Sequence, residues 1–369
     1  MKILFALLIT ALCLTFHSLR AGPVDETKII IEPEEHTHAA RPDSHAPISI
    51  MGDHTHAAGE FMVSYRFMFM DMDGMQHGTS SISSAEVFAN NYTVTPTRMT
   101  MEMHMLGLMY APTDRLTLMA MIDLQVLEME HQIFPGAGTL IGLNNGFSTF
   151  TTKSRGAGDL QLAGYYSLYK RDGLKLHAGL GLGLPTGSIA KTYPVPGPGG
   201  ILERLLPAAM QPGSGTVEVI PSLTFTHELE SFTYGFQAKG TVPTYENYRG
   251  YTMGDEVEVN VWAGWKVFDW VSLEGGFAYH WTGELTGAQD GIGLNPPFAP
   301  TRWTVPTAFG SNYGGHVVEG IVGVNFLVPD GPLAGNRIAA DVRVPFYQDL
   351  NGYQLQTDYT MTVGWQFAW

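Results

Sequence analysis

The chain has 369 residues and a formal net charge of −15, and only 15% of its residues are charged. This acidity excludes a nucleic-acid-binding protein, because such proteins need a basic surface. The single cysteine, Cys13, lies in the first 21 residues, so the rest of the chain contains neither a disulfide nor a cysteine-based zinc site.

Residues 1–21 have the pattern of a secretory signal peptide. Lys2 precedes an apolar run over 3–16, and the small residue Ala21 ends the segment. We expect the signal peptide to be removed after Ala21 or Gly22. No later stretch of 18 apolar residues predicts a transmembrane helix.

Residues 22–59 are predicted to be a periplasmic extension that is largely disordered, because they contain too few apolar residues to form a core. Histidine-rich tracts of this kind often bind Cu²⁺, Zn²⁺ or Ni²⁺. The candidate metal ligands are His36, His38, His45, His54 and His56. A solvated tail with chance histidines is the alternative interpretation.

Residues 60–369 alternate between apolar and polar side chains, and this period of two predicts β-strands. The expected strands cover 61–70, 99–110, 116–126, 159–169, 174–184, 219–225, 232–242, 257–267, 271–281, 318–328, 338–346 and 359–369. In a transmembrane barrel, lipid-facing residues alternate with lumen-facing residues in this way. The fold class predicted is therefore all-β, a transmembrane antiparallel β-barrel of about 12 strands.

The links between the expected strands alternate between long and short. Long links cover 73–97, 132–149, 185–214 and 281–313, and short links cover 111–115, 170–173, 228–231, 268–270 and 329–336. Bacterial barrels have long external loops and short periplasmic turns, so both termini are predicted to be periplasmic. The loop 194–200 and the leucines after it are a candidate plug, or else lie on the rim.

The last expected strand ends on Trp369 and places a large apolar residue at every second position from Tyr359. This pattern resembles the C-terminal assembly signal of bacterial outer-membrane proteins. The expected partners are therefore outer-membrane lipids and the outer-membrane assembly machinery.

Methionine is abundant, with 18 residues, and its placement on the expected strands suggests a role in the lumen. In the first strand several methionines share a face with Arg66, and in the third strand they share a face with Asp123. The lumen candidates on these strands are Met62, Met68, Met70, Met72, Met119 and Met121. Thioether sulfur is a soft ligand that selects Cu(I), although methionine also serves as plain filling of irregular space.

The second expected strand places Met99 to Met109 on one face, and Glu102 and His104 on the other. A charge facing lipid near the middle of the membrane costs about 2–4 kcal/mol. We therefore expect Glu102 and His104 to face the lumen and the methionines of this strand to face lipid, with a β-bulge as the alternative that would give the opposite register.

A set of short motifs recurs in a characteristic order along nearly the whole expected barrel. They are MGDHTH at 51–56, GEFM at 59–62, DMDG at 71–74, MTMEMHM at 99–105, YAPTDR at 110–115, GAGDL at 156–160, PTGS at 185–188, GSGT at 213–216 and YQDLNG at 347–352. In these motifs the chain resembles the outer-membrane transporter-like family named for the meta-pathway of phenol degradation. The resemblance implies an outer-membrane barrel with a transport role, and the Met/His-rich subset implies handling of copper or related metals.

No Gly-x-Ser-x-Gly or His-Glu-x-x-His motif is present, so we do not expect an enzyme. The predicted function is an outer-membrane transporter or channel for small solutes, including soft metal cations such as copper. The alternatives are a channel for small hydrophobic or aromatic compounds and a metal-sequestering barrel that does not conduct. No firm cofactor is expected beyond copper or zinc ions bound transiently. The expected location is the bacterial outer membrane.

Overall fold

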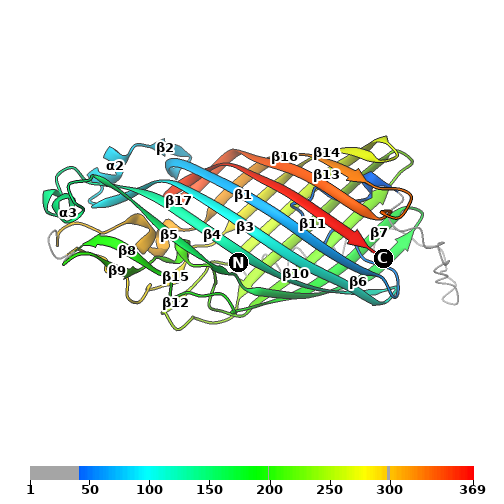
Figure 1. Ribbon diagram of the computed structural model, residues 1–369, viewed down its shortest axis with the longest axis horizontal. Helices are drawn as coiled ribbons and strands as arrows, with labels where there is room; N and C mark the ends of the chain where they lie inside the picture. The colour runs from blue at the N-terminus through cyan, green and yellow to red at the C-terminus, as the bar shows by residue number, and fades with distance from the viewer. Residues whose placement is uncertain (1–40, 198, 297–299) are drawn as a thin grey trace, which may run out of the picture. The chain divides into compact units, whose positions relative to one another are not determined.

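The computed structural model describes residues 41–197, 199–296 and 300–369. Its main sheet is antiparallel and closes on itself, because the last strand pairs with the first (Figure 1). The ring strands are β1 (Phe61–Gly78), β3 (Val94–Thr113), β4 (Leu116–Ile133), β6 (Leu160–Arg171), β7 (Leu174–Leu184), β10 (Glu218–Glu228), β11 (Phe232–Pro243), β13 (Glu256–Phe268), β14 (Val271–Thr282), β16 (Gly315–Leu327) and β17 (Asn336–Ala368). The predicted all-β barrel is confirmed.

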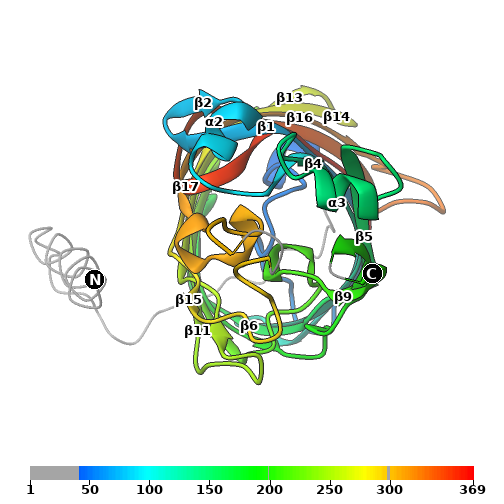
Figure 2. The ribbon, with the colours of Figure 1, turned by 90° about the vertical axis from the view of Figure 1, so that its left-hand side faces the viewer.

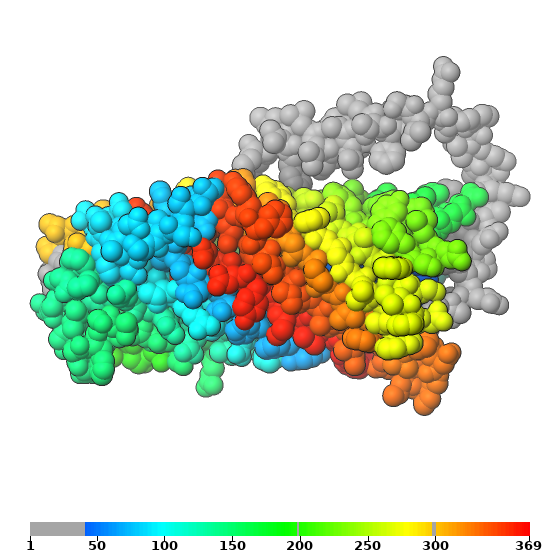
Figure 3. Space-filling model, turned by 90° about the horizontal axis from the view of Figure 1, so that it is seen from above, coloured from blue at the N-terminus to red at the C-terminus, as the bar shows by residue number. Residues whose placement is uncertain are grey.

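The ring has eleven strands, whereas the sequence predicts about twelve. The last two predicted strands are joined in β17, which is 33 residues long. Its residues 337–350 pair with β16, and its residues 350–368 pair with β1. In Figure 3 the red end of the chain lies beside the blue and cyan of β1 on the barrel surface.

The remaining elements are not strands of the ring. The short strands are β2 (Ser80–Ile82), β5 (Thr149–Ala157), β8 (Thr192–Gly197), β9 (Gly200–Leu205), β12 (Tyr251–Thr252) and β15 (Thr286–Gly287). The helices are α2 (Ser84–Ala89), α3 (Gly138–Leu143), and the short 3₁₀ helices η2 (Pro42–Ser44), η3 (Ala208–Met210), η4 (Pro306–Ala308) and η5 (Gly310–Asn312). None of the helices in the described part of the chain is long and apolar enough to cross a membrane.

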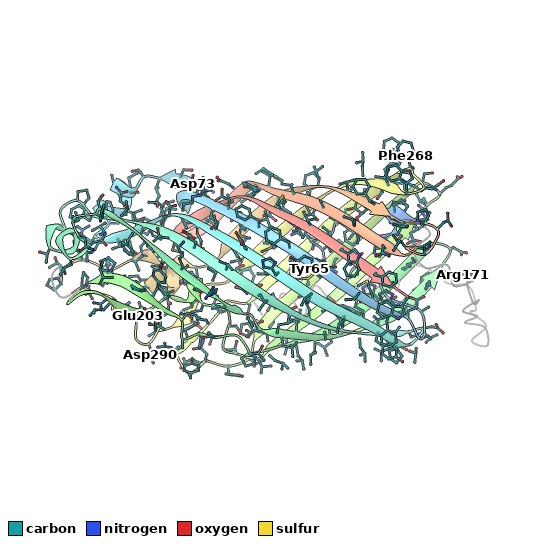
Figure 4. All side chains as sticks on the ribbon, viewed as in Figure 1. Tyr65, Asp73, Arg171, Glu203, Phe268 and Asp290 are labelled. Carbon is teal, nitrogen blue, oxygen red and sulfur yellow. The ribbon has the colours of Figure 1, made fainter. Side chains whose placement is uncertain are left out.

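The long and short links gather at opposite ends of the barrel. Arg171 and Phe268, which lie at short turns, are at one end, whereas Glu203 and Asp290 of the long links lie toward the other (Figure 4). The elements α2, α3, β8 and β9 also lie at the long-link end (Figure 1). This arrangement agrees with the alternation of link lengths in the sequence.

Strand β4 illustrates how the sequence places side chains in the wall. Leu118 and Leu124 are exposed on the outer face, while Thr117 and Asp123, which directly precede them, are buried on the inner face. A membrane strand needs only about 9–11 residues, and β4 has 18. The outer face of β4 is accordingly apolar as far as Val126, and then carries the exposed carboxylate Glu130 toward the long-link end.

Candidate functional site in the lumen

Residues 42–56, here called the lumen segment, run inside the barrel. The blue part of the ribbon lies within the ring in the end-on view of Figure 2. Ile48 and Ile50 are 1% and 2% exposed. The backbone is bound along its length, since the carbonyl of Pro42 accepts a hydrogen bond from Ser272 Oγ at 2.9 Å, and the amide of His56 donates to Thr117 Oγ1 at 2.9 Å.

This order differs from the disorder expected for residues 22–59. The segment is ordered without an apolar core of its own, because polar side chains of the wall form hydrogen bonds with its backbone. Residues 22–40, including the candidate ligands His36 and His38, lie outside the described residues. The boundary at residue 59 between extension and barrel stays a prediction.

Three arginines of the wall hold the lumen segment. Arg66 Nε donates to the carbonyl of Ile48 at 3.0 Å, and Arg337 Nη2 donates to the carbonyl of Ala46 at 2.9 Å. Arg343 Nε donates to Ser49 Oγ at 2.8 Å. Hydrogen bonds from charged groups are stronger than neutral ones, so these contacts fix the path of the segment.

Gly52 lies closely against the wall of the barrel. Its φ is +71°, and a Cβ atom there would lie 2.5 Å from the hydroxyl oxygen of Tyr165. Its carbonyl accepts hydrogen bonds from His177 Nε2 at 2.9 Å, Gln237 Nε2 at 3.3 Å and Thr224 Oγ1 at 3.4 Å. Only glycine combines this left-handed backbone with such a close approach to the wall.

Next to Gly52, the segment brings together three groups that can bind a metal ion. One ligand atom each from His45, Asp53 and His54 lies within 4.8 Å of the others. His54 Nδ1 is 2.7 Å from Asp53 Oδ1, and the ring of His56 lies 4.9 Å from that of His54. Thus three of the five histidines predicted as ligands are adjacent in the lumen, and their role as ligands stays a prediction.

Burial affects the protonation of these histidines. It lowers the pKa of His45 to about 3, with a further lowering from the nearby charge of Arg337. Burial also lowers the pKa of His56. Both imidazoles are therefore neutral near pH 7, which is the form that binds metals.

Methionines cover one inner side of the barrel, which we call the methionine wall. It consists of Met62, Met68, Met70 and Met72 on β1, Met99, Met101, Met103, Met105 and Met109 on β3, and Met119, Met121 and Met129 on β4. Met62, Met109 and Met119 are register partners near the start of β1, as are Met72, Met99 and Met129 toward its end. The wall therefore runs along the barrel.

The orientation of β3 is the reverse of the expected one. Met105 and Met109 are buried, whereas Leu106 and Leu108 are more than half exposed, so the methionines face the lumen. Glu102 and His104 have the same parity as Leu106 and belong to the outer face, where His104 Nδ1 bonds Tyr65 Oη at 2.8 Å. The expectation that these two residues face the lumen is wrong.

The length of β3 is the physical reason for this error. At 20 residues it extends beyond the apolar band, so charged Arg98 and Glu102 face outward without facing the middle of the membrane. Leu106, Leu108 and Tyr110 alternate on one face and indicate correctly that this face is the outer one, because the most apolar stretch of a strand fixes which of its residues face lipid.

The methionine wall meets other groups at both ends. Near the start of β1, a pocket is lined by Asp53 and His54 of the lumen segment together with Met51, Met62, Met109, Met119 and Met121. Toward the long-link end, the wall packs against Leu206 and Met210. The candidate plug at 194–206 therefore contributes Leu206 to the lumen, while Ile201 and Leu202 are exposed.

The sequence reasoning missed the lumen segment and the arginines that hold it. Arg66 was assigned to the lumen by its parity, but nothing in its surroundings indicated a partner from residues 46–50. The motif MGDHTH was a usable signal, because its glycine precedes a carboxylate and two histidines that the fold gathers at one site.

Among solved structures, the chain is similar to an outer-membrane channel from Pseudomonas putida F1, with a TM-score of 0.57 and 15% identity over 87% of this chain and 99% of that chain. A second is the β-domain of the Bordetella autotransporter BrkA, with a TM-score of 0.42 and 13% identity over 84% of this chain and 100% of that chain. A third is the Pseudomonas putida toluene transporter TodX, with a TM-score of 0.36 and 11% identity over 93% of this chain and 99% of that chain. TM-scores below 0.5 are too low to relate the last two barrels to this chain.

No family model matches the chain, and no curated protein matches it significantly. The resemblance to the family named for phenol degradation therefore stays a prediction. The closed barrel, its exposed apolar outer face and its likeness to an outer-membrane channel place the protein in the bacterial outer membrane.

Proposed function

We propose that the protein is an outer-membrane channel for small hydrophobic or aromatic compounds, which move along the methionine wall. The methionine wall itself is the observation that carries this proposal. Thioether side chains are apolar and flexible, so they adapt to ligands of differing shape. The methionines of β3, with their neighbours on β1 and β4, offer a small apolar molecule a path through a lumen that is otherwise lined by polar groups.

In this proposal both termini lie in the periplasm and the long links face outward. Outer-membrane lipids contact the exposed apolar residues, and the outer-membrane assembly machinery recognises the last strand. The lumen segment fills the interior next to the methionine wall, so passage requires it to shift away from Met62 and Met119, with which its Met51 and His54 share a pocket.

Uptake of the hydrophobic dye N-phenylnaphthylamine by bacteria expressing the protein tests this route, because an intact outer membrane excludes the dye. We expect expression to increase uptake. Replacing Met62, Met109 and Met119 together by Ser should reverse most of the increase, whereas replacing them by Leu should preserve it. Met253→Ser is the control, since Met253 packs with Tyr251 and Leu285 in a separate cluster. Equal uptake by the Ser and Leu variants would contradict the proposed route.

The second candidate function is passage of soft metal cations such as Cu(I). It is favoured by the pocket in which His54 and Asp53 face the methionine wall, because thioether and imidazole are both copper ligands. The same Leu variant separates the two functions, because leucine is apolar but has no sulfur. Loss of Ag⁺ uptake with retained dye uptake in that variant would favour the cation route.

A further inference from the structure

We propose that His45, Asp53 and His54 form a binding site for a transition-metal cation inside the barrel, on the lumen segment itself. The cation class is one that prefers nitrogen ligands, represented by Zn²⁺ or Cu²⁺. The site depends on the fold of the lumen segment and not on which solute the channel conducts.

The local fold explains why residues eight or nine positions apart meet. The amide of Ile50 donates to the carbonyl of Pro47 at 2.9 Å, which turns the chain back on itself. Asp53 Oδ2 accepts a hydrogen bond from the amide of Ala46 at 3.0 Å, which joins the two ends of this turn. His45 is thereby placed against Asp53 and His54, with 4.6 Å between the two imidazole ring centres.

The distances suit a metal after a small contraction. The three ligand atoms lie within 4.8 Å of one another. Zinc bonds to imidazole nitrogen are about 2.0–2.1 Å long, so ligand atoms around a tetrahedral ion are roughly 3.3 Å apart. Side-chain rotation is sufficient for this contraction, because the ligands lie on a turn whose backbone bonds are already formed.

The hydrogen bonding of the imidazoles is incomplete. Within the described residues, His45 Nδ1, His54 Nε2 and His56 Nε2 are buried and have no hydrogen-bond partner. Nδ1 of His45 lies 3.4 Å from Asp53 Oδ2, in a geometry that is not a hydrogen bond. Buried polar atoms in proteins are nearly always paired, so these nitrogens, on neighbouring rings whose centres lie 4.6 and 4.9 Å apart, indicate a missing partner that accepts their lone pairs.

The groups around these nitrogens are arranged as in known metal sites. Glu60 Oε2 lies 3.2 Å from Nδ1 of His56 and leaves Nε2 of that ring without a partner among the described residues, while the proposed ligand Asp53 already meets His54 through Oδ1. A carboxylate on one ring nitrogen fixes the tautomer and directs the lone pair of the other nitrogen toward the metal. His56 is therefore a candidate for a fourth ligand beside His54.

The ligand types select among cations. Arg66 and Arg337 contact the lumen segment at Ile48 and Ala46, close to the single carboxylate of the site. Hard cations such as Mg²⁺ need several oxygen ligands, whereas this site offers two imidazoles and one carboxylate. Zn²⁺ and Cu²⁺ bind imidazole strongly and tolerate a ligand set with one negative charge.

Binding has a structural consequence, because the metal would join residue 45 to residues 53 and 54. This link closes the turn between them and holds the lumen segment in the barrel. The amides of Ser49 and Ile50, which lie within the closed turn, should then exchange their hydrogens more slowly.

The test is a calorimetric titration of the purified, folded full-length protein with Zn²⁺ after removal of bound metals by a chelator. We expect one Zn²⁺ per barrel and no heat from Mg²⁺. His45→Asn and His54→Asn should each weaken Zn²⁺ binding at least tenfold. His131→Asn is the matched control, because His131 is also buried but stacks on Phe150 away from the site. A further variant replaces His36 and His38 by Asn.

Hydrogen exchange of residues 46–50, measured with and without Zn²⁺, distinguishes the loss of a metal ligand from a variant that fails to fold. Zn²⁺ should slow this exchange in the unmodified protein and in His131→Asn, but not in His45→Asn. Absence of Zn²⁺ binding, binding unchanged in both site variants, or binding lost only in the His36/His38 variant would overturn the proposal. Dye uptake is measured separately, so failure of the channel proposal leaves this result intact.

Discussion

Gly52→Ala is expected to release the lumen segment without unfolding the barrel. The new methyl group would lie 2.5 Å from Tyr165 Oη and 2.7 Å from Tyr165 Cζ, so the backbone must move away from the wall. That movement breaks the hydrogen bonds that His177 and Gln237 donate to the carbonyl of residue 52. None of these contacts joins two strands of the ring.

The magnitude follows from these separate effects. A left-handed conformation costs an alanine about 1 kcal/mol more than a glycine. Each lost hydrogen bond costs about 1 kcal/mol. Together they lower the free energy needed to release the lumen segment from the wall by about 3 kcal/mol. The fraction of molecules in which the segment is released then rises roughly a hundredfold.

Hydrogen–deuterium exchange followed by mass spectrometry measures this population. The reporting amides are those of Ala46, Ser49 and His56, which are bound to Asp53, Asp341 and Thr117. In Gly52→Ala they should exchange roughly a hundredfold faster, while amides of the ring strands keep their exchange rates.

Gly59→Ala is the control for this experiment. Gly59 also has a positive φ, of +89°, but a Cβ there would meet nothing within 4 Å. It therefore introduces the same backbone strain without a collision. Unchanged exchange of the lumen segment in Gly52→Ala, or equally fast exchange in Gly59→Ala, would refute the reasoning that Gly52 holds the segment through its contact with Tyr165.

Two further substitutions test other parts of the barrel. Arg337→Met should lower the free energy of unfolding by about 3 kcal/mol in urea, because it leaves the backbone carbonyl of Ala46 and the side-chain oxygen of Asn325, both buried, without their donor. Leu106→Lys should make insertion into lipid vesicles less favourable by about 2–4 kcal/mol, because Leu106 is on the apolar outer face. Leu333→Lys, in a short turn, should leave insertion unchanged, and equal effects of the two lysines would contradict the assignment of the outer face.

Much of the fold could be predicted because it depends on local pattern. The alternation along β4 predicted that Met119 and Met121 face inward and that Leu118 faces outward, as the structure has them. The lengths of the links predicted which ends of the strands lie together. A closed antiparallel ring follows from these two features, since no other arrangement of strands in lipid satisfies every backbone group.

The candidate site could be predicted only in part. The histidines of 45–56 were recognised as ligands by composition, but the turn that brings His45 to His54 depends on the hydrogen bond between Ala46 and Asp53. The prediction placed the methionines of β1 and β4 in the lumen but those of β3 toward lipid, because the charged face of β3 was assigned to the lumen. Its true extent depended on how far β3 projects beyond the apolar band.

The sequence by itself determined the all-β class, the sites of most ring strands and the side of the wall on which most residues lie, because period two is a local property of the chain. Only the tertiary structure decided that residues 42–56 fill the lumen. That segment has no period and few apolar residues, and its order comes from Arg66, Arg337 and Arg343, which are distant in sequence. Closure of the ring brings these three arginines into one lumen, where they donate hydrogen bonds to the segment.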